Sequence, residues 1–286
     1  MAQDGKYRLR GVSKETDVPR YRDLEQSGIE MVKANIATGE GLEEAFRDAQ
    51  VAFIVLPSFD KEIIGKEYNY GTTLIEKAKY HGIRTLIFST AVNTSDISGK
   101  KYCIPHFDEK ARVEEYIRAI QKTKDAFDHV AFVAPSFYFQ NFSWKSFAPK
   151  QMGDHHVFRF PHVGVLTGCD IHDLGYVVKE VIENPKKYDN RTIILNSEEA
   201  PLQDYIQKYE EITQNKARLE EISIDEFKKN PDIHHKEELG QMFEFINDYT
   251  YFGKDRPDYF LPAREVYPHL KTWGCYLKES PLKQQT

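Results

Sequence analysis

A histidine and a lysine offer the most specific chemistry in the sequence. His106 and Lys110 stand four residues apart in the run His-Phe-Asp-Glu-Lys, so in a helix they share one face. An imidazole, with a free pKa of about 6.5, exchanges protons near neutral pH, and an ammonium group beside it binds anions or shifts neighbouring pKa values. In the structural alternative, His106 begins the helix and Lys110 pairs with Glu114. The pair therefore predicts either a site for proton transfer and anion binding or an ordinary helix start.

Polar side chains also follow two of the expected strands. Ser13 and Lys14 end the first strand, and Ser89 and Thr90 follow an apolar run that begins near residue 84. Ligands of open α/β sheets bind at the carboxyl ends of the strands, where a lysine favours a 2′-phosphate and an acidic residue favours a free ribose hydroxyl. These residues predict contacts with an NADP-type ligand. In the alternative, the hydroxyls satisfy turn backbone groups and the lysine is solvated.

Residues 137–147 are dense in aromatic side chains and come directly after an expected strand. Such rings suit the wall of a pocket for a flat apolar ligand or a nicotinamide, and they suit equally well a core that joins two lobes. We expect a mixture of the two. In that arrangement residues 138–141 lie nearest the pocket, and Trp144 and Phe147 are buried.

No run in the sequence matches a glycine-rich phosphate loop. The nearest candidate is the pair Gly39 and Gly41, but Glu43 and Glu44 follow it and would repel a pyrophosphate. We interpret the pair as a plain loop.

Metal and thiol sites are not indicated either. The histidine pairs at 155–156 and 234–235 lack metal-ligand spacing, so we expect no metal. The cysteines at 103, 169 and 275 form no paired motif, which fits a reducing compartment and argues against disulfides, zinc and a thiol nucleophile.

The composition excludes several classes of protein. At 286 residues, with 40% hydrophobic and 29% charged residues, the chain suits a globular protein of one large or two modest domains. A net charge of −6 provides no general attraction for nucleic acid. The longest apolar runs, such as residues 51–56, are far shorter than the roughly 20 residues of a spanning helix. We therefore expect no membrane and no direct nucleic-acid contact, with the cytoplasm as the compartment.

Short apolar runs alternate with helical patterns through the first 200 residues, which is typical of a parallel sheet covered by helices on both faces. The expected strands are residues 7–13, 29–34, 51–56, 84–89, 129–134 and 192–195. Between them we expect helices, including a long one from about residue 61 to Gly82. A hairpin over residues 157–166 follows, and the last ninety residues are mainly helical.

Several segments together resemble the NmrA-like proteins, atypical members of the short-chain dehydrogenase superfamily, and most of all their redox-sensing members. The segments are residues 4–10, 52–55, 106–110 with 113–116, 136–141 and 173–175, spread over nearly the whole chain. The resemblance implies an α/β, Rossmann-like fold with a smaller, mostly helical C-terminal lobe. We expect the sheet domain at residues 1–148 and 168–198, and the smaller lobe at 149–167 and 199–286.

The resemblance also implies a function. It points to NADP(H) as the ligand and to a redox-sensing regulatory role with little or no catalysis. Such a role is exercised in the cytoplasm, and also in the nucleus, through protein partners such as a transcription factor or a metabolic enzyme. A homodimer is compatible with it.

Carried over position by position, the resemblance assigns cofactor contacts from the adenosine end to the nicotinamide end. Ser13 and Lys14 approach the adenosine ribose and its 2′-phosphate, and Asn35 and Ile36 approach the adenine. The remaining contacts are Leu56, Pro57 and Ser58 on the linking ribose and phosphates, Lys110 on the nicotinamide ribose, and Tyr138, Phe139, Gln140 and Asn141 beside the nicotinamide.

The helix pair resembles the Tyr-x-x-x-Lys pair of the dehydrogenases. There the lysine lowers the pKa of the tyrosine and holds the cofactor ribose, while the tyrosine exchanges a proton with the substrate carbonyl. His106 stands at the tyrosine position, which agrees with a sensor of little turnover. The alternative is an NAD(P)H-dependent reductase of quinone-like or other flat aromatic compounds, in which His106 or Lys110 assists protonation.

The family's first strand and glycine-rich turn find no match, because the sequence begins at what resembles the end of the first helix. The helix N-terminus after that turn receives the cofactor pyrophosphate, so we expect weakened NADP binding. That strand lies in the middle of the family's sheet. We therefore expect exposed apolar side chains and unpaired backbone on both sides of its place.

Overall fold

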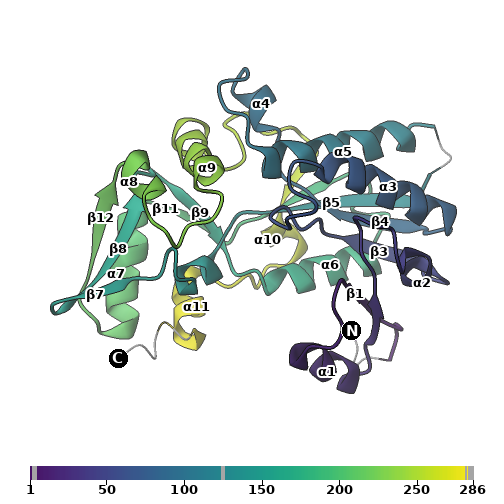
Figure 1. Cartoon of the computed structure of the whole chain (residues 1–286), viewed down its shortest axis with the longest axis horizontal. Helices are drawn as coiled ribbons and strands as arrows, with labels where there is room; N and C mark the ends of the chain where they lie inside the picture. Colours follow the sequence, from purple (N-terminus) through teal and green to yellow (C-terminus); the bar gives the residue numbers. More distant parts are fainter. Residues whose placement is uncertain (2–4, 124–125, 281, 283–286) are drawn as a thin grey trace.

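The computed structural model describes residue 1 and residues 5–123, 126–280 and 282. Its main sheet is parallel throughout, with the strand order β13-β10-β5-β4-β3 (Figure 1). The strands are β3 (Val51–Ile54), β4 (Thr85–Ser89), β5 (His129–Pro135), β10 (Thr192–Leu195) and β13 (Phe260–Pro262). Every residue of β4 and β10 is buried, as a parallel sheet covered on both faces requires. The α/β class expected from the sequence is confirmed.

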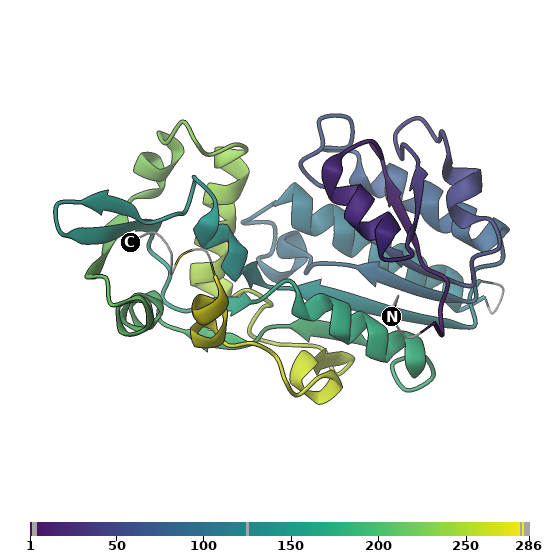
Figure 2. The same cartoon turned by 90° about the horizontal axis from the view of Figure 1, so that it is seen from below.

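Helices cover both faces of this sheet (Figure 2). One face carries α3 (Glu67–Tyr80) and α5 (Pro105–Gln121), and the other carries α6 (Asp173–Glu183) and α10 (Ala263–Val266). Alternate residues of β4 divide between two cores, because side chains of a strand point to opposite faces. Leu86 and Phe88 pack with α3 and α5, whereas Ile87 packs with α6. This layering is the parallel sheet with helices on both faces that the sequence predicted.

Helix α3 begins later than the sequence pattern suggested. The predicted start near residue 61 is wrong, because the chain turns twice before Glu67. The side chain of Asp60 accepts a hydrogen bond from the backbone of Glu62 at 2.9 Å, and Gly65 adopts a left-handed φ of 69°. Residues 57–66 are therefore a folded loop at the carboxyl end of β3.

The first part of the chain forms a separate parallel pair of strands with two helices. These elements are β1 (Arg10–Ser13), α1 (Pro19–Gln26), β2 (Glu30–Lys33) and α2 (Leu42–Phe46). Within the described residues β3 pairs only with β4, so its other edge has no ladder partner. Val12, Phe53 and Val55 expose 50%, 38% and 50% of their surface. The expected exposure of apolar side chains beside β1 and β3 is thereby confirmed.

A smaller lobe combines two short sheets with four helices at one end of the molecule (Figure 1). Its strands are β6 (Phe137–Tyr138), β7 (Lys150–Met152), β8 (His155–Pro161), β9 (Leu166–Cys169), β11 (Glu198–Ala200) and β12 (Ala217–Ile222). Its helices are α7 (Leu202–Thr213), α8 (Ile224–Lys228), α9 (Lys236–Tyr249) and α11 (Trp273–Glu279). Strand β13 and helix α10 fall within residues 199–286, the range expected for this lobe, yet they lie in and against the main sheet.

The predicted hairpin over residues 157–166 is wrong. Strand β8 pairs antiparallel with β7, across a turn in which Gly153 has a φ of 63°, and parallel with β12. Strand β9 belongs to the other short sheet, with β6 and β11. The three residues of β7 are all exposed and therefore carry no alternating apolar pattern that could have predicted the pairing.

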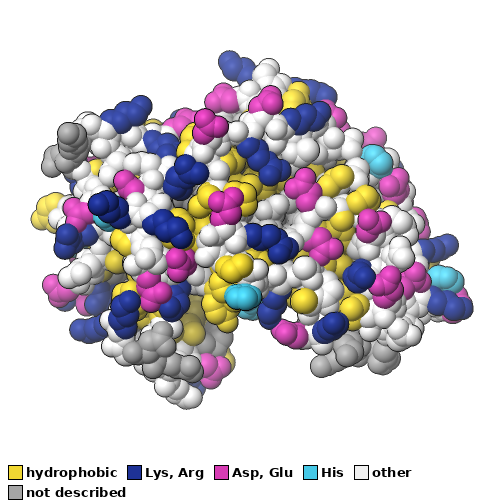
Figure 3. All heavy atoms as spheres, turned by 180° about the vertical axis from the view of Figure 1, so that it is seen from behind, with side chains coloured by type: hydrophobic (Ala, Val, Ile, Leu, Met, Phe, Trp, Pro, Cys, Tyr) yellow, Lys and Arg dark blue, Asp and Glu magenta, His cyan; other side chains and the backbone are white. Residues whose placement is uncertain are grey.

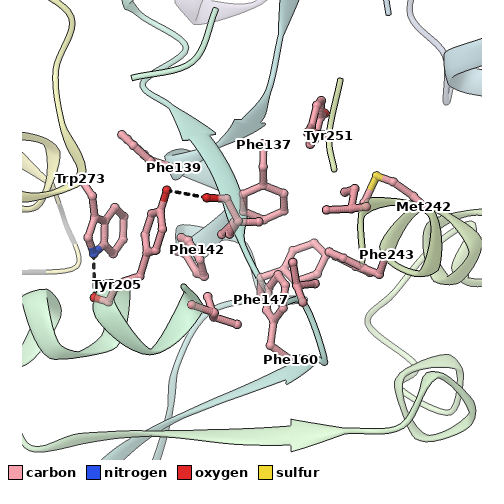
Figure 4. Close-up of a cluster of buried hydrophobic side chains, with 14 of the residues drawn as sticks. Phe137, Phe139, Phe142, Phe147, Phe160, Tyr205, Met242, Phe243, Tyr251 and Trp273 are labelled. Carbon is pink, nitrogen blue, oxygen red and sulfur yellow. Dashed lines mark hydrogen bonds between the residues drawn. The ribbon is translucent and has the colours of Figure 1, made fainter. Parts of the chain in front are cut away.

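An aromatic core fills the smaller lobe (Figure 4). Phe139 and Phe142 are fully buried, and the indole nitrogen of Trp273 donates to the Tyr205 carbonyl oxygen at 2.9 Å. Phe147 is buried as predicted, but the predicted burial of Trp144 is wrong, since it is 56% exposed. Trp144 is the residue at which the short 3-10 turn Phe139–Ser143 ends, and its backbone is already extended there.

Acidic and basic side chains are interspersed over the rear face of the molecule (Figure 3). Among the described residues, none of the helices has the length and apolar character needed to cross a bilayer.

Candidate functional site

Lys110 lies in a buried ion pair rather than on an open surface. Its ammonium group donates to the Glu67 carboxylate and to the Ser58 hydroxyl. Glu67 is 2% exposed and Lys110 is 8% exposed. Burial raises the pKa of Glu67 and lowers that of Lys110, while their mutual attraction acts in the opposite direction on both. No pattern in the sequence indicated Glu67, which lies 43 residues away from its partner.

The structural alternative for Lys110, a pair with Glu114, is wrong. Glu114 accepts instead from Arg118 at 2.8 Å and from the Thr192 hydroxyl at 2.8 Å. Its carboxylate therefore ties α5 to β10, and Lys110 is left to face the loop after β3.

His106 is held by an acidic residue of the smaller lobe. One oxygen of Glu238 in α9 accepts from the backbone N–H of His106 at 2.8 Å and contacts the ring Nδ1 at 2.6 Å. Burial alone would raise the pKa of Glu238, but these contacts with His106 outweigh it and lower the pKa. Phe59 packs beside the imidazole, with ring centroids 5.2 Å apart, and stacks on His235 at 4.8 Å. His106 and Lys110 thus lie one helical turn apart, each against a carboxylate.

Lys14 and Asn35 meet at a third carboxylate. The Lys14 ammonium contacts Glu62 at 2.5 Å and Asp60 at 3.4 Å, and the Asn35 amide donates to Glu62 at 3.5 Å. The hydrogen bond with Glu62 raises the pKa of Lys14, and its counterpart lowers the pKa of Glu62. The Ser13 hydroxyl bonds the Tyr21 hydroxyl at 2.8 Å instead. Two residues predicted for the adenosine end of a cofactor therefore converge on one anionic group.

The loop after β3 contacts both Lys14 and Lys110. Leu56 is buried at its start, and the Pro57 carbonyl oxygen accepts from the Asp60 N–H at 3.0 Å. Ile63 is 3% exposed and fixes the middle of the loop in the protein. We call residues 58–67 the acidic loop, because its carboxylates contact Lys14 at one end and Lys110 at the other.

The four residues predicted beside a nicotinamide have different surroundings. Tyr138 is partly exposed, and burial of its hydroxyl raises its pKa to about 12. Phe139 lies in the aromatic core, where a Cβ on Gly168 would come within 2.5 Å of its ring. Gln140 donates to Asp170 at 2.5 Å, and the side-chain oxygen of Asn141 is buried without a hydrogen-bond partner among the described residues. The Asn141 oxygen is therefore an unsatisfied acceptor inside the protein, and Phe139 has no exposed surface that a ligand could contact.

Ser89 and Thr90 lie at the carboxyl end of β4, as predicted, and are 5% and 3% exposed. The Thr90 hydroxyl donates to the neighbouring carbonyl oxygen of Ala91 at 3.3 Å, as in the structural alternative. Ile36 packs against the core beneath α2 and α3. These residues border the site without adding a charge to it.

The donors present fit part of a dinucleotide. Lys14 and Asn35 already bind an anion, and Lys110 and Ser58 form a second polar group that a ribose could contact. A cradle for the pyrophosphate is not found among the described residues. At the turn that carries Gly39 and Gly41, a Cβ on Gly41 would lie 2.1 Å from the Lys33 carbonyl oxygen, so this glycine serves the packing of the turn. The interpretation of that pair as a plain loop therefore stands.

The described part of the chain offers no metal site, and its cysteines are unpaired. It contains no group of three or more histidine, cysteine, aspartate or glutamate residues able to hold a metal ion. Burial raises the pKa of the Cys169 thiol to about 12, and the exposed Cys103 and Cys275 are free. One cavity of about 360 Å³ lies in the smaller lobe between β8 and α8, and neither Lys14 nor Lys110 lines it.

Known proteins resemble this chain over most of its length. The family model described as "NmrA-like family" matches residues 1–277. An NmrA-like family domain-containing protein of Dictyostelium discoideum is 25% identical over 265 residues, covering 90% of this chain and 85% of that protein. The NmrA-like oxidoreductase FrzB of Cladobotryum sp is 26% identical over 241 residues, covering 78% and 70%.

Solved structures show the same fold at lower identity. NmrA, a negative transcriptional regulator in complex with NADP, superposes with a TM-score of 0.75 at 19% identity, covering 94% of this chain and 86% of its own. The triphenylmethane reductase of Citrobacter sp., complexed with NADP(H), superposes with a TM-score of 0.73 at 14% identity, covering 94% and 89%.

Proposed function

This chain belongs to the NmrA-like family, and from that premise we propose that it is an NADP(H)-related redox-sensing regulator with little or no catalysis. The proposal is carried by one observation. Lys14 with Asn35 and Lys110 with Ser58, the polar groups predicted for the two ends of the cofactor, are joined by a single loop. NADP has a 2′-phosphate at its adenosine end, which suits Lys14 and Asn35. At its other end it has the nicotinamide ribose, which suits Lys110 and Ser58. Similar proteins of the same fold bind NADP.

Low turnover is supported by the position of His106. A dehydrogenase needs a group at this position that exchanges a proton with the substrate carbonyl. Here Glu238 binds both the ring and the backbone of His106, and Phe59 packs against the ring. His106 is therefore held by a contact between the lobes, which accounts for its position without a role in catalysis.

We propose that the cofactor binds weakly in this chain. The supporting facts are the two lysines already paired with carboxylates and the lack of a pyrophosphate cradle among the described residues. An isothermal titration with NADPH is expected to give a Kd above about 10 μM. A Kd in the low micromolar range or below contradicts weakened binding, and no heat at millimolar NADPH contradicts cofactor binding itself.

The regulatory role extends this proposal to partners. We propose that the chain, as a monomer or a homodimer, contacts a transcription factor or a metabolic enzyme in the cytoplasm or the nucleus. The support is family membership and the description of NmrA as a negative transcriptional regulator. If the role is redox sensing, proteins captured by the intact chain will differ between excess NADPH and excess NADP⁺. Lys110→Ala, which removes the ammonium beside the expected ribose, should abolish that difference.

A second candidate function is NAD(P)H-dependent reduction of quinone-like or other flat aromatic compounds. It is favoured by the contact of His106 with Glu238, because a carboxylate on one ring nitrogen orients an imidazole for proton transfer at the other. Relatives described as oxidoreductases also support it. Oxidation of NADPH with a panel of quinones tests this candidate. Turnover that falls at least about a hundredfold in folded His106→Phe would establish it, and no turnover with any quinone would exclude it for that panel.

A further inference from the structure

We propose that the acidic loop is an internal competitor of the cofactor, and that Glu62 is the residue that discriminates against a 2′-phosphate. The inference rests on the proposed binding of NADP(H) at Lys14, Asn35 and Lys110. It goes beyond that function because it assigns a role in ligand discrimination to carboxylates that were not predicted as cofactor contacts.

At the adenosine end, a carboxylate stands in for a phosphate. Glu62 contacts the Lys14 ammonium at 2.5 Å and accepts from the Asn35 amide at 3.5 Å, and Asp60 lies 3.4 Å from the same ammonium. The positions expected to recognise the adenosine half thus share an anion that the chain itself supplies. A 2′-phosphate must remove Glu62 from Lys14 or lie beside two negative charges.

A free 2′-hydroxyl meets no such conflict. It can donate a hydrogen bond to a carboxylate, and acidic residues placed near this hydroxyl favour NAD over NADP. In the common arrangement that acid follows the second strand of the sheet. In this chain the family's first strand finds no match, so β1 corresponds to that second strand. The residue after β1 is a lysine, and the loop after β3 supplies the acid. Glu62 therefore opposes the preference for 2′-phosphate that Lys14 alone would create.

The loop is built to keep Glu62 in place while allowing its release. The Asp60 side chain accepts from the Glu62 N–H at 2.9 Å, and the buried Ile63 and Glu67 anchor the following residues. Lys14 and Glu62 themselves are 44% and 49% exposed. Ion pairs this exposed are weak and are screened by salt, so a bound ligand can replace them.

The nicotinamide end is occupied by the same loop. Ser58 accepts from Lys110, and Phe59 lies over both His106 and His235. A ribose that bonds Lys110 and Ser58 breaks the hydrogen bond between them, whereas the buried Glu67 keeps its contact. Displacement therefore involves residues 58–62 and leaves the α3 end of the loop fixed.

The test compares ligands with and without a 2′-phosphate. Isothermal titrations are run with NADPH, NADH, 2′,5′-ADP and 5′-AMP on the full chain, on Glu62→Gln and on Glu25→Gln. Glu25 is an exposed residue of α1, so its variant makes the same charge change outside the acidic loop. Thermal unfolding of each variant confirms that it is folded.

Glu62→Gln is expected to tighten binding of NADPH and 2′,5′-ADP by about three- to tenfold, as for loss of a weak competing ion pair. Binding of NADH and 5′-AMP should stay within about twofold, and Glu25→Gln should change none of the four. If Glu62→Gln tightens the binding of all four ligands equally, or does not tighten the binding of NADPH, the inference is overturned while the proposed cofactor function stands. If no ligand binds any of the three proteins at millimolar concentration, the proposed cofactor function falls together with it.

Discussion

The pair of Lys110 and Glu67 dominates the energetics of the site at the scale of single residues. Both side chains are almost fully removed from water, and each is the principal charge that compensates the other. Removing one partner leaves an uncompensated buried charge, which is far costlier than replacing both by apolar groups.

We therefore expect Lys110→Met to lower the free energy of unfolding by about 3–5 kcal/mol at pH 7. The double variant Lys110→Met with Glu67→Leu should be more stable than this single variant. Urea unfolding of the wild type, both single variants and the double variant measures the coupling. A loss below about 1 kcal/mol in Lys110→Met would mean that the pair is effectively exposed.

Single residues of the site could be selected from the sequence, but their partners could not. Lys14 was selected because it ends a strand, Lys110 because it shares a helix face with His106, and Asn35 because of the family resemblance. The structure places each of them against a carboxylate. Glu62, Glu67 and Glu238 could not be selected. They lie far from their partners in sequence, and only the fold brings them together.

The contact between α3 and α5 is the feature that positions the site at the scale of elements. Gly71 lets the two helices approach closely, since a Cβ there would lie 2.6 Å from Val113 and 3.0 Å from Leu56. Leu56 begins the turn into the acidic loop, so this packing also sets where Ser58 meets Lys110.

Gly71→Ala is expected to destabilise the protein by about 1–3 kcal/mol, because the added methyl group overpacks the helix contact. Gly175 in α6 provides the matched control, since a Cβ there meets nothing within 4 Å. Gly175→Ala should stabilise by up to about 1 kcal/mol through helix propensity. The midpoints of urea unfolding compare the two variants, and a Gly71→Ala protein as stable as the wild type would show that α3 and α5 are farther apart.

Elements with strong periodicity were predicted well and turns were not. The buried strands β4 and β10 and the helix carrying His106 follow directly from apolar runs and helical spacing. The start of α3 depends on a turn closed by the Asp60 side chain, and the pairing of β8 depends on a turn at Gly153. Neither turn can be predicted from the spacing of apolar residues.

At the scale of the whole molecule, the site lies where the two lobes meet. Glu238 of α9 binds His106 of α5, and Asp248 at the other end of α9 accepts from Lys101 at 2.6 Å and from the Tyr102 hydroxyl at 2.8 Å. Phe59 of the acidic loop contacts both His106 and His235, so a movement of this loop would act directly on the smaller lobe. Under the proposed function, this arrangement connects the loop that a cofactor would displace to the smaller lobe.

The parallel sheet covered by helices could be anticipated from the alternation of strands and helices, but the outer part of the sheet could not. Strand β13 has three residues, too few for a periodic pattern, and joins β10 after more than sixty intervening residues. The open edge of β3, by contrast, agrees with the unpaired backbone expected beside the place of the family's first strand.

Hydrogen–deuterium exchange in the presence and absence of millimolar NADPH tests the central claim, that a nicotinamide dinucleotide binds between Lys14 and Lys110. The account predicts slower exchange at the ends of β1 and β2 and at the start of α5. Slower exchange confined to the cavity between β8 and α8, or unchanged exchange throughout, would contradict it.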